Sequence, residues 1–312
     1  MEALRKLGHL DLWEQDVPIP RHVLRKKNQV VEGIVCLLTD RIDAEVIASA
    51  PRLRSLSTMS VGFDHIDIDA CNERGIPVGH TPGVLTESTA DLAFSLLLAA
   101  GRRVMESADF IKAGLWKTWS PTLLLGQDIY GATLGIVGFG RIGEAVARRA
   151  AGFSMRILTH HPTPIDPERL GQYSATQVPW DTIVEESDFL SLHVPLTDQN
   201  AQMINAAVLR RMKPTAVLIN TARGGLINTG ELCEALKGRM LGAAALDVTD
   251  PEPLPPDHPL LSFSNCLVVP HIGSATIATR TKMAMMAVEN LSAGLRGIPM
   301  PNCVNPGVLG SG

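Results

Sequence analysis

Three polar side chains that suit carbonyl chemistry each follow a predicted strand in the second half of the chain. They are Arg223 after the apolar run 216–220, Asp247 after 241–246 and His271 after 266–269. In an open parallel sheet, the carboxyl ends of the strands border the ligand crevice. We therefore expect one arginine, one aspartate and one histidine at one edge of one sheet.

Reduction of a ketone that neighbours a carboxylate needs a cation and a proton donor. The planar guanidinium of Arg223 suits both the carboxylate and the carbonyl oxygen. Histidine is a common general acid, so His271 is the candidate donor. Glu252 lies between Pro251 and Pro253, which restrict its backbone, and is our candidate for the carboxylate that orients His271.

Each of these residues also has an ordinary structural interpretation. Arg223 fits a surface ion pair, Asp247 a cap, Glu252 a solvated loop, and His271 is one of nine histidines. A single histidine is a weak indication of catalysis, because structural sites also accommodate it. Their common position after strands is what favours a catalytic site.

A glycine-rich segment carries the second chemical motif. It reads Gly138-Phe139-Gly140-Arg141-Ile142-Gly143, follows the predicted strand 133–137 and opens a helix near Arg141. In that context the glycines allow a tight turn, approach of a pyrophosphate and close packing of helix on strand. The alternative is a glycine-rich turn without a ligand, but strand, turn and helix together predict dinucleotide binding.

The next strand ends in His160 and His161, where NAD-binding proteins usually carry an acidic residue. The first carboxylate after them is Asp166. Without a carboxylate there is no repulsion against a 2′-phosphate, and both histidines are able to donate hydrogen bonds to it. The sequence therefore favours NADP(H), with NAD(H) held by another group as the alternative.

The elements that must position these residues form an alternating α/β pattern. Short apolar runs alternate with helix-like stretches, which predicts a mostly parallel sheet with both faces covered. The runs are 133–137, 156–158, 189–194, 216–220, 241–246 and 266–269. A smaller pattern precedes them, with strands expected at 33–38 and 53–59 and a short run at 10–13. Thr86 is a candidate N-cap for a helix to about Arg103, and the last helix is expected at 276–295.

Composition excludes several other classes of protein. The chain has 312 residues and a formal net charge of −4, so it lacks the positive field that nucleic acid requires. Its longest apolar run, 92–100, is too short to cross a bilayer, and a cytoplasmic location is the default expectation. The five cysteines are widely spaced and include no C-x-x-C pair, so we expect neither disulfides nor a metal site.

Together these segments resemble the D-isomer-specific 2-hydroxyacid dehydrogenase family over nearly the whole chain. The resemblance is carried by Ser60–His65, Gly138–Gly143, His193–Thr197, Asn220–Gly225, Asp247–Pro255 and Pro270–Ser274. It implies a flavodoxin-like substrate domain, 1–84 with 276–312, into which a Rossmann-type doubly wound parallel sheet, 85–275, is inserted. It also implies a homodimer paired through the Rossmann domains, in which an aromatic residue of 116–119 reaches the partner's site.

The resemblance assigns roles residue by residue. Arg223, Glu252 and His271 match the catalytic set, and the substrate is held by the backbone N–H groups of Val61 and Gly62 together with Ser274. Further matching positions surround the cofactor, namely Pro195, Thr221, Asp247 and Gly273. The implied reaction is NADPH-dependent reduction of glyoxylate or hydroxypyruvate to glycolate or D-glycerate.

The chain departs from the family pattern in two places. His161 replaces the acidic residue at the end of the second Rossmann strand. This departure argues against NAD as the cofactor and does not affect the catalytic residues. Family members begin with a strand and a helix before the stretch that matches 4–20, so the small domain is expected to lack its first strand. A non-catalytic dinucleotide-binding paralogue or cofactor-sensing corepressor is therefore the alternative function.

Overall fold

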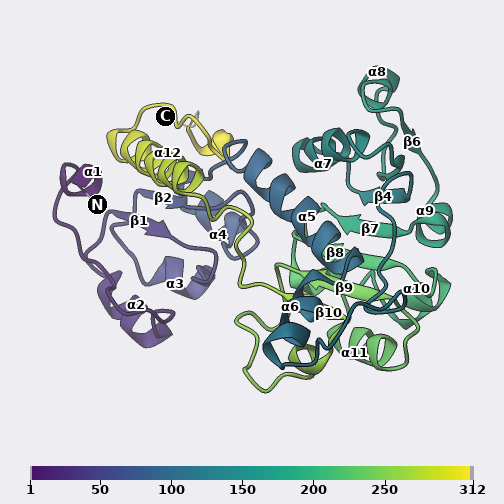
Figure 1. Ribbon diagram of the computed structural model, residues 1–312. Helices are drawn as coiled ribbons and strands as arrows, with labels where there is room; N and C mark the ends of the chain where they lie inside the picture. The colour runs from purple at the N-terminus through teal and green to yellow at the C-terminus, as the bar shows by residue number, and fades with distance from the viewer. Residues whose placement is uncertain (1, 310–312) are drawn as a thin grey trace. The chain divides into compact units, whose positions relative to one another are not determined.

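The computed structural model describes residues 2–309 and divides into two compact units (Figure 1). The first unit joins Met1–Leu85 to Thr276–Gly312, and the second unit is Thr86–Ala275. The chain therefore leaves the first unit once and returns to it.

The second unit is built on a seven-stranded sheet in which every neighbouring pair is parallel. Its order is β10-β9-β8-β7-β4-β5-β6, so the direction of winding reverses between β4 and β7. This arrangement confirms the Rossmann-type doubly wound sheet. The strands are β4 (Thr133–Val137), β5 (Arg156–His160), β6 (Ala175–Gln177), β7 (Phe189–Leu192), β8 (Val217–Asn220), β9 (Ala243–Leu246) and β10 (Cys266–Val268).

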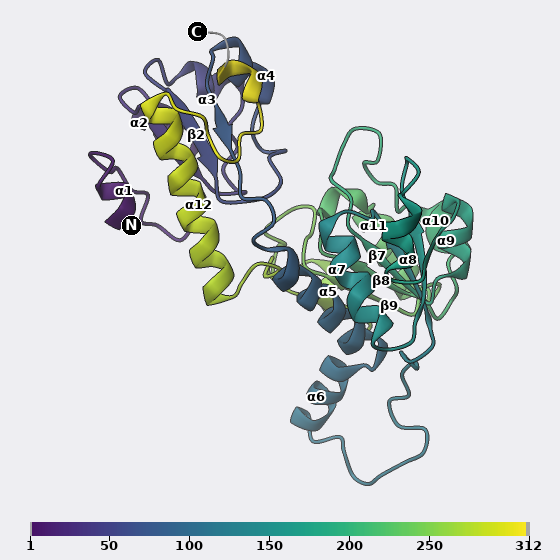
Figure 2. The same ribbon diagram turned by 90° about the horizontal axis from the view of Figure 1, so that it is seen from above.

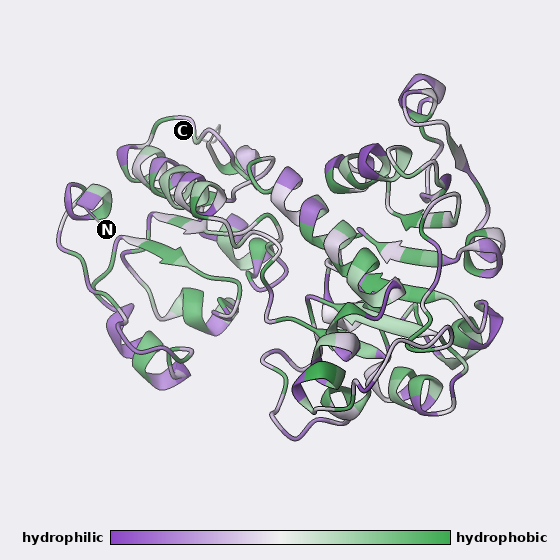
Figure 3. Cartoon of the chain, viewed as in Figure 1, coloured by the Kyte–Doolittle hydropathy of each residue, from purple (hydrophilic) through white to green (hydrophobic). Residues whose placement is uncertain are grey.

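Helices cover both faces of this sheet. On β8, Val217 and Ile219 pack with α5 (Thr86–Gly101) and α7 (Arg141–Ala151), whereas Leu218 packs with the helices of the other face. Those helices are α9 (Trp180–Glu186), α10 (Ala206–Arg211) and α11 (Thr229–Lys237). The central strands are accordingly hydrophobic, whereas the edge strand β6 carries polar residues (Figure 3). The unit also contains α6 (Val104–Lys112), α8 (Pro167–Gly171) and the 3₁₀ turns η1 (Gly224–Leu226) and η2 (Pro259–Ser262).

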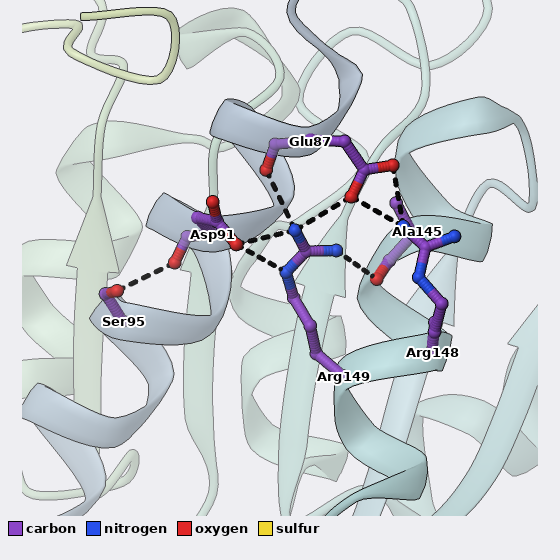
Figure 4. Close-up of polar contacts among 6 residues, drawn as sticks. All are labelled: Glu87, Asp91, Ser95, Ala145, Arg148 and Arg149. Atoms are coloured by element: carbon purple, nitrogen blue, oxygen red, sulfur yellow. Dashed lines mark hydrogen bonds and ion pairs between the residues drawn. The ribbon is translucent and has the colours of Figure 1, made fainter. Parts of the chain in front are cut away.

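Ion pairs fix the amino-terminal turns of α5 to α7 (Figure 4). The Arg149 side chain is 19% exposed, contacts the carboxylates of Glu87 and Asp91, and donates to the carbonyl of Ala145 at 2.7 Å. Arg148 also contacts Glu87. The two guanidinium groups, Arg148 first, hold the pKa of Glu87 below its usual value. The start of α5 is therefore held within the second unit by electrostatic contacts as well as by its apolar face.

The first unit has a three-stranded parallel sheet in the order β1-β2-β3, with β1 at Gly33–Cys36, β2 at Ser55–Thr58 and β3 at Val78–Gly79. Helix α12 (Ile277–Arg296) packs on it so closely that a Cβ on Gly294 would overlap the side chain of Ser55. Thr276 caps the start of α12 by accepting from the Thr279 N–H at 3.1 Å. The other helices are α1 (Glu2–Arg5), α2 (Arg21–Lys27), α3 (Ala44–Ala48), α4 (Ile68–Glu73) and the 3₁₀ turn η3 (Pro306–Leu309).

Several local predictions differ from the structure. The run 10–13 forms no strand, because no strand of residues 2–309 lies beside it to complete a ladder; Trp13 instead donates to the Val17 carbonyl at 2.8 Å within a local turn. Helix α5 begins at Thr86 itself, so Thr86 is not the residue before the helix. The short strands β3 and β6 were not predicted. Within residues 2–309, no helix has the length and apolar composition needed to span a bilayer.

Candidate active site

The turn after β4 contains three glycines, and a Cβ would meet different surroundings at each of them. Gly138 adopts a φ of 94°, and a Cβ there would lie 2.7 Å from the carbonyl oxygen of His193. A Cβ on Gly143 would overlap the carbonyl oxygen of Gly138, so α7 packs directly on the turn. A Cβ on Gly140 would meet no atom of the described chain within 4 Å. Two glycines are therefore needed for folding, and the third leaves open space.

That open space lies at the amino end of α7. Gly140 is the N-cap residue, and the first intrahelical hydrogen bond runs from the Glu144 N–H to the Gly140 carbonyl at 2.9 Å. The N–H groups of Arg141, Ile142 and Gly143 precede that bond, and helix geometry leaves such groups without intrahelical acceptors. Together with the helix dipole, they form a site suited to a phosphate group.

His160 and His161 lie at the end of β5, as predicted. The Nδ1 of His160 donates to the Val178 carbonyl at 3.2 Å, and its ring meets Trp180 edge-on at 5.5 Å. The Nδ1 of His161 lies 3.0 Å from the hydroxyl of Thr163. Both rings are therefore oriented through Nδ1, and this strand end holds no carboxylate.

The first acidic residue after β5, Asp166, has a structural role. Asp166 caps α8 by accepting from the Glu168 N–H at 2.9 Å. The next residue of the helix, Arg169, donates to the carbonyl of Phe139 at 3.0 Å and also contacts Glu144. A guanidinium thus stands beside the glycine turn, and Asp166 is engaged elsewhere.

The carboxyl end of β8 carries Arg223 on a tightly held loop. The buried side chain of Asn220 donates to the Arg223 carbonyl at 2.7 Å and accepts from the Ala222 N–H at 3.0 Å. The hydroxyl of Thr221 is buried and has no hydrogen-bond partner among the described residues. Asn220 was not among the predicted functional residues, although a polar residue that closes an apolar strand is a usable signal.

The carboxyl end of β9 carries Asp247, which holds the loop of His271. Its carboxylate accepts from the N–H groups of Ile272 at 2.6 Å and Gly273 at 2.9 Å, and its carbonyl accepts from the His271 N–H at 2.9 Å. Burial raises the pKa of Asp247, while the Ile272 N–H opposes that shift. His271 has a φ of 50°, which is strained for a residue with a Cβ, so Asp247 stabilises a turn that would otherwise relax.

His271 and Glu252 are in direct contact. The Nδ1 of His271 lies 2.5 Å from Oε1 of Glu252, and the two side chains are 26% and 27% exposed. The second oxygen of Glu252 accepts from the Thr249 N–H at 3.3 Å. This pair directs Nε2, the other ring nitrogen of His271, away from Glu252, so Nε2 is the atom suited to exchange a proton with a substrate.

His193 and Pro195 follow β7 beside the glycine turn. Burial lowers the pKa of His193 to about 4, so its ring is neutral at physiological pH. Its Nε2 lies 2.8 Å from the hydroxyl of Ser191, and the Asn200 side chain donates to the Pro195 carbonyl at 2.8 Å. His193 therefore has a structural role in shaping this strand end and carries no charge there.

These features fit a bound dinucleotide. Open space at Gly140 is where a pyrophosphate must approach the backbone, and the unpartnered Thr221 hydroxyl is a buried polar group at the same sheet edge. Gly273 and Ser274 follow His271 on the adjoining loop. In the first unit, Val61 and Gly62 form the turn after β2, and their N–H groups donate to no acceptor within the described residues.

Comparison with known proteins gives results that agree with this geometry. Residues 94–273 match the family described as D-isomer specific 2-hydroxyacid dehydrogenase, NAD binding domain. A glyoxylate reductase from Korarchaeum cryptofilum is 48% identical, covering 96% of this chain and 90% of that protein. The glyoxylate reductase/hydroxypyruvate reductase of Mus musculus is 43% identical over 94% of this chain and 90% of that protein.

Solved structures have the same architecture. A protein from Thermus thermophilus is 47% identical and aligns with a TM-score of 0.87, covering 97% of this chain and 96% of the other. Sequence and structure are thus matched over nearly the whole length of both proteins.

Proposed function

This chain belongs to the D-isomer specific 2-hydroxyacid dehydrogenase family, and from that premise we propose that it reduces glyoxylate and hydroxypyruvate to glycolate and D-glycerate. It is an oxidoreductase that uses a nicotinamide dinucleotide, and its substrate is a small keto or hydroxy acid. The observation that carries the proposal is the Glu252–His271 pair, which follows β9 and β10 at the same carboxyl edge of the sheet as the glycine turn after β4.

We propose the following roles for the candidate residues of the second unit. When bound, the reduced cofactor supplies the hydride that the keto carbon accepts. His271, oriented by Glu252, donates a proton to the carbonyl oxygen, and the guanidinium of Arg223 binds the anionic substrate and polarises that oxygen. The N–H groups of Arg141, Ile142 and Gly143 would hold the pyrophosphate, and Pro195, Thr221, Asp247 and Gly273 would surround the cofactor. Ser274 is a further substrate-binding candidate. In the first unit, the N–H groups of Val61 and Gly62 bind the substrate carboxylate.

The test is the oxidation of NADPH and NADH by folded protein with each keto acid. We expect turnover with glyoxylate and hydroxypyruvate, loss of turnover in His271→Gln, and cofactor affinity in that variant equal to wild type. His258→Gln is a matched control in the same unit and should keep its activity. A folded protein that binds cofactor but does not reduce either acid would support the non-catalytic alternative.

We further propose that NADP(H) is the preferred cofactor. The support is local: the end of β5 carries His160 and His161, Asp166 is engaged as a helix cap, and Arg169 lies beside the glycine turn. A 2′-phosphate meets no repelling carboxylate in this environment. We expect a higher kcat/KM with NADPH than with NADH, and a reversed ratio in His161→Asp. Equal ratios in wild type and variant would refute the preference.

The assembly that we propose is a homodimer formed through the second unit. Helix α6 and the segment after it extend from that unit as an arm (Figure 2). The arm exposes large apolar side chains, among them Trp119, which is 78% exposed. The others are Val104, Met105, Ile111, Leu115, Trp116, Leu123 and Leu125. A groove of about 640 Å³ adjoins the base of the arm. Exposed apolar side chains that gather in this way are typical of a protein interface.

Light scattering after size exclusion tests the dimer. We expect a dimer for wild type and a monomer for the double variant Leu115→Glu and Trp119→Glu. Val30→Glu, an exposed apolar residue of the first unit, is the control and should stay dimeric. A wild-type protein that is monomeric at all concentrations refutes the assembly.

A further inference from the structure

The turn Ser60-Val61-Gly62 of the first unit has all three of its carbonyl groups engaged. The Ser60 carbonyl accepts from the Thr81 N–H at 2.8 Å, and the Gly62 carbonyl accepts from the Ser60 hydroxyl at 2.7 Å. The Val61 carbonyl lies 2.9 Å from Nδ1 of His80. Three consecutive peptide groups are therefore fixed in orientation.

Fixing these carbonyls also fixes the N–H groups that follow them. In a planar trans peptide, the C=O bond and the N–H bond of the next residue point in opposite directions. The bond from Thr81 therefore sets the direction of the Val61 N–H, and the bond from His80 sets that of the Gly62 N–H. Both N–H groups lack an acceptor among the described residues, so they form a pair of oriented donors.

His80 is itself held rigidly. Its backbone N–H donates to the Asn302 carbonyl at 3.1 Å, and its carbonyl accepts from the side chain of Asn290 at 2.8 Å. Asn290 is completely buried. The His80 ring meets the ring of Phe63 edge-on at 5.8 Å. Because a carbonyl only accepts, Nδ1 of His80 carries a hydrogen in this arrangement.

A second histidine supports the same turn from the segment after β2. The Ser60 hydroxyl uses its one hydrogen for the Gly62 carbonyl, so the Thr58 hydroxyl donates to Ser60 at 2.7 Å. The hydrogen of Thr58 is then used, and Nε2 of His65 must donate to Thr58 at 3.0 Å. The donor and the acceptor of each hydrogen bond in this chain are therefore fixed, and no other assignment of the hydrogens keeps all of these bonds.

We propose that His80 is a positioning residue for the substrate carboxylate: by holding the Val61 carbonyl it aims the Gly62 N–H, with the His65–Thr58–Ser60 chain supporting the same turn. The inference rests on the proposed function for the identity of the ligand. His80 acts through the peptide group and does not touch the substrate. Its removal should therefore weaken carboxylate binding and leave both the chemistry and the cofactor site unchanged.

Two amide substitutions test this role. The amide nitrogen of asparagine stands close to the place of Nδ1, whereas that of glutamine stands close to the place of Nε2. His80→Asn should keep the KM for glyoxylate within about threefold of wild type. His80→Gln and His80→Leu should raise it about tenfold, the loss expected when one donor to a charged group is misdirected. In all three variants kcat and the dissociation constant for NADPH should stay within about twofold. The exposed His22→Leu is the matched control.

Oxalate binding, measured by calorimetry, separates failure of this inference from failure of the proposed function. If wild type does not turn over but His80→Gln weakens oxalate binding relative to His80→Asn, the positioning role stands and the reductase proposal fails. Equal KM and equal oxalate affinity in wild type, His80→Asn and His80→Gln would overturn the positioning role. A parallel fall of kcat, cofactor affinity and melting temperature in His80→Gln would also overturn it, because that pattern indicates a general structural defect.

Discussion

Substitution of Gly140 by alanine should separate cofactor binding from folding. Gly140 has φ −84° and ψ −167°, which alanine adopts without strain, and the new Cβ meets no described atom within 4 Å. The fold therefore has room for the methyl group. A pyrophosphate that contacts the backbone at this residue would collide with the methyl group, because the Cβ extends about 1.5 Å from Cα into the same space.

The expected magnitudes differ for the two properties. Loss of glycine freedom in the unfolded chain stabilises by about 0.4–1 kcal/mol, and alanine as an N-cap costs roughly the same. The melting temperature should therefore change by less than about 4 °C. Displacing the phosphate from even one charge-assisted hydrogen bond costs about 1.5–3 kcal/mol, so the dissociation constant should rise at least about tenfold.

Fluorescence titration with NADPH and NADH, alongside thermal melting, measures both properties. The loss of affinity in Gly140→Ala should be equal for NADPH and NADH, because both cofactors contain the pyrophosphate. Gly171→Ala, which also places its Cβ in open space, should bind normally. Gly143→Ala should lose stability as well as binding, because its Cβ overlaps the Gly138 carbonyl. A folded Gly140→Ala that binds both cofactors within twofold of wild type would refute the assignment of this turn.

Three further predictions concern the second unit. Asp247→Asn keeps one acceptor oxygen and places an NH₂ group against one of the two backbone N–H groups, so we expect about 1–3 kcal/mol of destabilisation in denaturant unfolding and a lower kcat; an unchanged midpoint would contradict this. Thr221→Val should leave the melting temperature unchanged but weaken cofactor binding in titrations, since no described residue forms a hydrogen bond with the hydroxyl. Because Arg148 and Arg149 lower the pKa of Glu87, its stabilising effect is present above its unfolded pKa of 4.5 and is lost as pH falls through the lower folded value. The melting-temperature difference between wild type and Glu87→Gln should thus shrink below pH 4.5, and a constant difference would contradict the ion pairing.

The fold could be predicted where burial on both faces leaves a continuous apolar run. The run 133–137 coincides with β4, and the other predicted runs of the two sheets differ from their strands by one or two residues at one or both ends. The strands β3 and β6 have only two and three residues, and their pairing depends on neighbours that are distant in sequence. Residues 10–13 have strand-like composition, but composition does not provide a neighbouring strand.

The candidate site could be predicted from residues that close strands, because topology brings such positions together. The contact expected between Glu252 and His271 is present, although their catalytic roles are proposals. Asn220 closes β8 and offers the same signal, but it was not predicted. His80 could not be predicted in this way, because its ring bonds to a backbone carbonyl, and hydrogen bonds to carbonyls leave no pattern of residue types in the sequence.

Both ligands of the proposed reaction are anions, yet the chain carries a net charge of −4. Long-range attraction therefore contributes little to their recognition, and direct donors must provide most of it. Apart from the side chains of Arg223, His160, His161 and Ser274, the donors proposed here are backbone N–H groups: those at the start of α7 and those of Val61 and Gly62. A peptide group cannot be removed by mutation, but it can be turned. Residues that hold its carbonyl, such as His80, should consequently affect anion binding as strongly as the removal of a cationic side chain that touches the ligand.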